Sequence, residues 1–103
     1  MSYRLEIRPE ALADIAGAAA WYEERESGLG ERFTREVIAT IDGLLPNPLI
    51  YRLRHRRFGA RWCFPESFPY KIVYGVAGAV ITIAAVIHAS RQEWHWMARF
   101  EGA

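Results

Sequence analysis

The chain has 103 residues, of which 51% are hydrophobic and 14% aromatic, enough to bury the core of a single domain spanning residues 1–103. One cysteine excludes an internal disulfide and is typical of a reducing compartment. The opening residues are charged where a secretion signal needs an apolar run. The longest apolar run, residues 72–87, contains two glycines and is shorter than the roughly 20 residues of a membrane span. We therefore expect a cytoplasmic protein with no membrane partner.

Charge is distributed unevenly along the chain, although the net charge is only +1. Residues 1–45 balance to −4 and residues 46–103 to +5. Almost all of the cations are arginines, so their positions are more informative than their number. This split predicts one surface for an anionic partner and a different surface for another partner.

The first half of the chain predicts a strand followed by two helices. Residues 3–8 alternate apolar and polar side chains, as a half-buried strand does, and Pro9 then suits a first helical turn. The first helix presents one predicted core face, made of Leu12, Ile15, Ala16, Ala19 and Tyr22. After a break at residues 28–30, the second helix presents Phe33, Val37, Ile41 and Leu44, and is expected to end at Pro46. Two helices joined by a short glycine-rich turn predict a helical hairpin.

The second half predicts strands. Residues 61–64 and 70–76 are rich in strand-forming residues, and residues 77–78 supply a tight turn. Residues 80–88 are apolar and largely β-branched, which is typical of a central strand, and residues 92–100 suit a short closing helix. The predicted class is α+β, in the order β-α-α-β-β-β with a short C-terminal extension. In that arrangement the helical hairpin packs on a small antiparallel sheet.

Four stretches in this order resemble the RelE/ParE toxin superfamily of bacterial type II toxin–antitoxin systems. They are "YRLEIRPEALADIAGAAAWYEE", "LGERF", "NPLIYR" and "FPYKIVYGV" followed by "VITIAAVIHASRQEWHWMAR". The last is most similar to the ParE-like, plasmid-stabilisation branch. The likeness extends over nearly the whole chain.

The resemblance implies a growth-inhibiting toxin that is neutralised by a cognate antitoxin. It implies no cofactor and no metal, and contact with operator DNA only through the antitoxin. The ParE-like branch is linked to poisoning of DNA gyrase, which makes gyrase the expected target. Two alternatives stay open: a RelE-like endonuclease that cleaves mRNA on the ribosome, and an inactive member that acts only in a repressor complex with its antitoxin.

The candidate catalytic residues are Lys71, His88 and Arg91. RNA cleavage without a metal needs a base, cations near the phosphate and an acid for the leaving oxygen. By the resemblance, Lys71 and Arg91 match two arginines of the RelE-like branch. The positions of its catalytic lysines and tyrosine fall on tryptophan, phenylalanine or methionine, which transfer no proton. The sequence therefore favours a protein that binds its target over an enzyme.

Arginines and one tryptophan are the candidate target- or partner-binding residues: Arg52, Arg54, Arg56, Arg57, Arg61, Arg91, Trp94 and Arg99. The arginine fork binds phosphate and carboxylate alike, so nucleic acid and an acidic antitoxin segment both remain possible ligands. A sheet edge invites an added strand, and the helical hairpin invites an amphipathic helix. The simplest alternative for Arg99 and His95 is the solvated side of the tail, and for His88 a polar cap of the core.

Metal and thiol chemistry are not expected. The three histidines, His55, His88 and His95, lack the short spacing of metal ligands, and no cysteine or acid completes a set. Cys63 lies between Trp62 and Phe64 in an apolar strand, where a thiol is usually inert.

Overall fold

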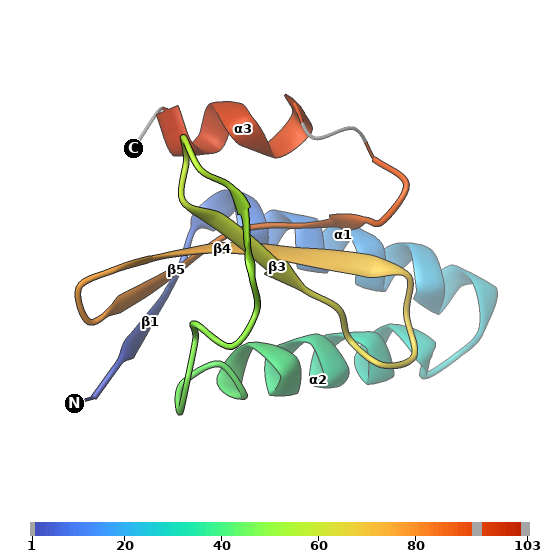
Figure 1. Cartoon of the computed structure of the whole chain (residues 1–103). Helices are drawn as coiled ribbons and strands as arrows, with labels where there is room; N and C mark the ends of the chain where they lie inside the picture. Colours follow the sequence, from blue (N-terminus) through green and yellow to red (C-terminus); the bar gives the residue numbers. More distant parts are fainter. Residues whose placement is uncertain (1, 92–93, 102–103) are drawn as a thin grey trace.

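The computed structural model describes residues 2–91 and 94–101, and all side chains among them except those of residues 94, 95 and 101. In chain order its elements are β1 (Arg4–Ile7), α1 (Pro9–Arg25), α2 (Leu29–Asp42), β2 (Leu53–His55), β3 (Ala60–Cys63), β4 (Tyr70–Ala77), β5 (Val80–His88) and α3 (Trp94–Glu101). The strands form one sheet in the order β1-β5-β4-β3-β2. The α1–α2 hairpin lies on one face of this sheet and α3 on the other (Figure 1). No helix in the described part of the chain is long and apolar enough to cross a membrane.

The sheet confirms the α+β class, but it is mixed and not wholly antiparallel. β1 pairs parallel to β5, whereas the other neighbours pair antiparallel. A parallel pair needs a long connection, and the helical hairpin and three strands between β1 and β5 supply one. β2 was not expected, because three residues of a basic segment are too few to show alternation.

The hairpin is close-packed at the start of α2. A side-chain carbon on Gly30 would lie 2.4 Å from the carbonyl oxygen of Ala19 on α1, so only glycine fits there. The Glu23 carboxylate accepts hydrogen bonds from the backbone N–H groups of Gly28 and Gly30, at 2.8 and 3.0 Å. A carboxylate at this position satisfies free N–H groups and suits the positive end of the helix dipole.

The core face of α2 is as predicted, and that of α1 is confirmed only in part. Phe33, Val37 and Ile41 are fully buried, and α2 ends at Asp42, before the first proline. On α1 the buried residues are Ala11, Ile15 and Ala18, while Leu12 is 51% exposed. Of the predicted stripe, Ile15 is buried and Ala19 and Tyr22 pack against the core, whereas Leu12 and Ala16 are exposed. Ala11 and Ala18 complete the core face in their place.

A β-bulge in β5 switches which residues face the hairpin. Val73 of β4 is opposite Ala85, but the next residue of β4 is opposite Ile83, so Ala84 is the extra residue. Before the bulge Ile83 faces the hairpin core, and after it Val86 does. An extra residue shifts the alternation of a strand by one position. The end of β5 therefore presents its even-numbered side chains to the hairpin side.

A second, smaller core holds α3 against the opposite face. Trp96 is fully buried among Ala60, Val73 and Ala85. Its ring makes an edge-to-face contact with Trp62, with ring centroids 5.9 Å apart. Trp96 therefore packs α3 onto this face of the sheet. The side chain of Trp94 lies outside the described residues, as do residues 92–93 of the predicted closing helix.

We expect Trp96→Ala to lower the free energy of unfolding by about 3–5 kcal/mol, the usual cost of truncating a buried aromatic side chain. Trp96→Phe keeps part of the packing and should cost clearly less. Urea unfolding of the three proteins measures the difference. An alanine variant as stable as the parent would show that α3 contributes little to this fold.

Candidate functional site

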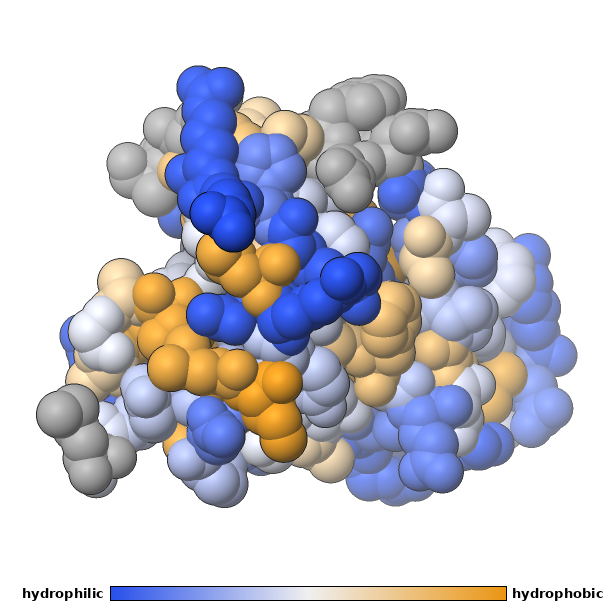
Figure 2. Space-filling view, in the orientation of Figure 1, coloured by the Kyte–Doolittle hydropathy of each residue, from blue (hydrophilic) through white to orange (hydrophobic). Residues whose placement is uncertain are grey.

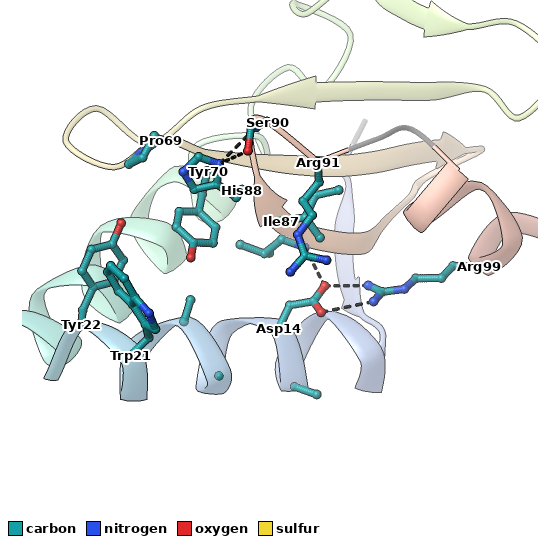
Figure 3. A pocket seen from close by; sticks show the side chains of 14 residues that line it. Asp14, Trp21, Tyr22, Pro69, Tyr70, Ile87, His88, Ser90, Arg91 and Arg99 are labelled. Atoms are coloured by element: carbon teal, nitrogen blue, oxygen red, sulfur yellow. Dashed lines mark hydrogen bonds and ion pairs between the residues drawn. The ribbon is translucent and has the colours of Figure 1, made fainter. Parts of the chain in front are cut away.

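A groove of about 830 Å³ runs between α1 and the second half of β5 (Figure 3). Gly17 on α1 leaves room for the groove. Trp21 and Tyr22 line one end of it, and Tyr70 and His88 line the facing strands. The bulge in β5 is what places His88 on this side of the sheet. The groove is therefore a product of the α1 sequence and of a register shift 60 or more residues later.

The groove lies along a part of β5 that no described strand covers on that side. The register of β1 on β5 ends with Ile7 opposite Ile83. Beyond that point side chains satisfy the backbone: Val86 N–H donates to Asp14 Oδ2 at 3.0 Å, and Arg99 Nη1 donates to the Ala84 carbonyl at 2.9 Å. Buried backbone groups need such partners where the sheet stops.

The Asp14–Arg99 ion pair joins α1 to α3 across this edge. Arg99 Nη1 lies 2.6 Å from Asp14 Oδ2, and Nη2 lies 3.2 Å from Oδ1. The side chains are only 22% and 17% exposed. The hydrogen bonds that Arg99 donates to Asp14 are the main cause that raises the pKa of Arg99 above its usual value. The expectation that Arg99 lies on the solvated side of the tail is therefore wrong, because its guanidinium turns inward to the bulge.

Arg91 gives the groove an excess of positive charge. It follows β5 in a tight turn, in which its N–H donates to the His88 carbonyl at 2.9 Å. Its exposed guanidinium and that of Arg99 both point toward Asp14 (Figure 3). Two guanidiniums thus face one carboxylate, which Arg99 already binds through two hydrogen bonds. Arg91 can therefore offer its donors to an incoming anion.

His88 is held by its neighbour Ser90. The Ser90 N–H donates to His88 Nδ1 at 3.1 Å, and the Ser90 hydroxyl lies 2.7 Å from the same nitrogen. A ring nitrogen that accepts from a backbone N–H carries no proton, so in this arrangement the ring proton is on Nε2. The nitrogen that could act as a base is already occupied, and the free Nε2–H can only donate.

The two phenols of the groove are also donors. Burial is the main cause that raises the pKa of Tyr22 and of Tyr70 above the usual tyrosine value, and Arg91 partly opposes it at Tyr70. Both hydroxyls are therefore protonated at neutral pH. They suit hydrogen bonding to a ligand better than removal of a proton from one.

Lys71 lies on the other face of the sheet. It is 6% exposed, and its Nζ is 4.6 Å from the centre of the Trp62 ring. Alternation along β4 sends Tyr70 to the hairpin side and Lys71 to the α3 side. The structure thus brings His88 and Arg91 together and separates Lys71 from both. Catalytic roles for the three stay a prediction from sequence.

The remaining predicted binding arginines lie at the far side of the sheet. β2 and β3 are separated from β5 by β4, so residues 52–61 form a second basic region away from the groove. Arg54 covers the Trp62 ring at 5.0 Å and Arg57 covers Phe58 at 5.2 Å. Arg61 donates to the Tyr51 carbonyl at 2.6 Å. Their role as binding residues, like that of Arg52, Arg56 and Trp94, stays a prediction.

Asp14, Trp21 and Tyr22 were not among the predicted site residues. No local signal marks Asp14, because an acid in the first turns of a helix has an ordinary capping explanation. Trp21 and Tyr22 belong to the first stretch that resembles the family, and Tyr22 also to the predicted core face of the helix.

Cys63 is buried as predicted, and burial raises its pKa to about 12, so its thiol is protonated and unreactive. Within residues 2–91 and 94–101 no group of three potential metal ligands is present.

These observations define an α+β domain with a helical hairpin on a mixed sheet, and a groove suited to binding. The chain matches the family model described as ParE toxin of type II toxin-antitoxin system, parDE, over residues 5–93. It therefore belongs to the ParE toxin family. A solved structure titled "Chromosomal ParDE TA system from P. aeruginosa" is similar with a TM-score of 0.71 and 19% identity, covering 84% of this chain and 95% of that one. That likeness supports the fold. No curated protein matches the sequence.

We expect Arg99→Ala to lower the free energy of unfolding by about 2 kcal/mol, because it removes charged hydrogen bonds to Asp14 and Ala84. Arg35→Ala is the matched control. It breaks an ion pair with Glu31 of 3.0 Å in which both side chains are at least 70% exposed, and should cost less than about 0.5 kcal/mol. Urea unfolding compares them, and equal effects would contradict the structural role of Arg99.

Proposed function

We propose that this protein is a growth-inhibiting toxin that acts in the cytoplasm by binding DNA gyrase and is silenced by a cognate antitoxin. Membership of the ParE toxin family supports the toxin role. One observation favours binding over cleavage: the polar side chains of the groove are poorly placed to remove a proton from a substrate. Nδ1 of His88 already accepts a hydrogen bond from Ser90. The hydroxyls of Tyr22 and Tyr70 are protonated at neutral pH. Lys71 lies on the opposite face of the sheet.

The groove supports an antitoxin that binds as an extended segment. No described strand covers the outer side of residues 84–88 of β5, but Asp14 and Arg99 already bond the Val86 N–H and the Ala84 carbonyl there. A peptide in the groove would therefore bind mainly through its side chains. Trp21 on α1 is 49% exposed, with the Arg25 guanidinium 3.4 Å from the centre of its ring, and its exposed part adds apolar contact area. Arg91 supplies a cation at the other end. The proposed occupant is therefore an acidic and apolar antitoxin segment.

The gyrase proposal is tested with purified toxin, gyrase and plasmid DNA. We expect inhibition of supercoiling together with trapped, cleaved DNA, and relief of both when the antitoxin is added. Unchanged supercoiling at a large excess of toxin would overturn the proposal. Codon-phased cleavage of translated mRNA in arrested cells would assign the ribosomal activity instead. Normal growth on expression would assign the inactive, repressor-only role.

We expect Arg91→Glu to weaken binding of the antitoxin encoded by the neighbouring reading frame at least tenfold, because it replaces attraction for an acidic segment by repulsion. Arg35→Glu, a charge reversal of the same size on the exposed side of α2, should change the affinity less than twofold. Titration calorimetry of both variants provides the comparison. Equal affinities for Arg91→Glu and the parent would place the antitoxin elsewhere.

A further inference from the structure

A second exposed surface, separate from the groove, lies where the chain passes from α2 into β2. We call it the β2 surface. Its apolar members are Leu49, Ile50, Tyr51 and Leu53, which are 50%, 70%, 42% and 42% exposed. Its charged members are Arg52, Arg54 and Arg56, all exposed. In Figure 2 hydrophobic side chains lie directly beside strongly hydrophilic ones over the segment between α2 and β3.

The positive charge of the β2 surface is not balanced by any acidic residue in the same segment of the sequence. Between Asp42 and Glu66 the chain carries five arginines and no aspartate or glutamate. Aliphatic side chains exposed beside such a concentration of one charge are unusual on a surface that faces only water. The combination is that of a binding surface whose partner supplies carboxylates around an apolar centre.

The apolar side chains favour a protein partner over nucleic acid. Single-stranded nucleic acids stack their bases on open aromatic faces. Here a guanidinium already covers the Trp62 ring, and another covers Phe58. The side chains left exposed beside the arginines are mainly aliphatic, Ile50 above all, with one exposed tyrosine, Tyr51. Aliphatic side chains match apolar side chains of a protein and have no counterpart in a phosphate backbone.

A second copy of the chain is a poor occupant. β2 is an end strand of the sheet, so two copies could meet edge to edge. That contact would bring arginines of one copy against arginines of the other, which is unfavourable. β2 is also short, and its register on β3 shifts between Leu53 and His55. Short, irregular and charged edges resist strand addition, so docking here occurs through side chains.

We propose that the β2 surface is where this toxin docks on its target, an acidic surface of gyrase with apolar side chains at its centre. The inference rests on the proposed function. It adds that target and antitoxin use different surfaces, because β2 and the groove along β5 lie on different parts of the sheet. Changes at the β2 surface should then weaken target binding and leave antitoxin binding intact.

The experiment compares two variants with a matched control. Ile50→Asp places a charge in the apolar centre, and the double variant Arg52→Glu with Arg56→Glu reverses two charges that make no described contact within the chain. Arg4→Glu is the control, since Arg4 is exposed on β1 at the opposite edge of the sheet. Thermal unfolding and antitoxin affinity establish that each variant is folded.

We expect both β2-surface variants to bind immobilised gyrase at least tenfold more weakly than the parent and to inhibit supercoiling correspondingly less. Arg4→Glu should stay within twofold. Parent-like inhibition by both variants would overturn the inference and leave the proposed function standing. A parent that fails to bind gyrase would overturn the proposed function, and this inference with it. Variant-sensitive binding to DNA alone, or variant-sensitive self-association, would assign the surface to another partner and also overturn the inference.

Discussion

The Asp14 carboxylate is the point on which the tertiary structure depends. β1 is too short to cover β5, so the sheet would leave backbone groups unpaired beyond Ile83. Asp14 accepts the Val86 N–H and binds Arg99, which in turn donates to the Ala84 carbonyl. One carboxylate thus closes the exposed end of the sheet and ties α3 to α1. Asp14 is thus the residue through which α3 on one face and the α1–α2 hairpin on the other make their described polar contact at this end of the sheet.

The same arrangement makes the groove suited to binding. Because Arg99 occupies Asp14 through two hydrogen bonds, the neighbouring Arg91 leaves the groove with an excess of positive charge. The groove also offers hydrogen-bond donors, among them the hydroxyls of Tyr22 and Tyr70. These donors and one spare cation attract carboxylates, while the groove's own carboxylate, Asp14, is engaged by Arg99 and the Val86 N–H. Its physical character agrees with a toxin regulated by a protein ligand.

The two basic regions also differ in kind. The groove is hollow, aromatic and bordered by strand backbone, which suits an extended segment. The β2 surface combines exposed arginines with exposed aliphatic side chains, and suits another folded surface. Both basic regions come from residues 46–103, and the sheet order keeps them apart, because β5 and β2 are not neighbours.

The sequence by itself determined the α+β class, the helical hairpin, the core stripe of α2 and the strands β4 and β5, since each is encoded by local periodicity. The parallel pairing of β1, the core face of α1 and the site itself required the tertiary structure. Asp14 and Arg99 are 85 residues apart in sequence, and their pairing depends on a bulge that no local pattern marks. Tyr70 and Lys71 show the same limit of sequence-based prediction. Strand alternation places these adjacent residues on opposite faces of the sheet, but only the packing of α1 and α3 decides which face forms the groove and which the small core.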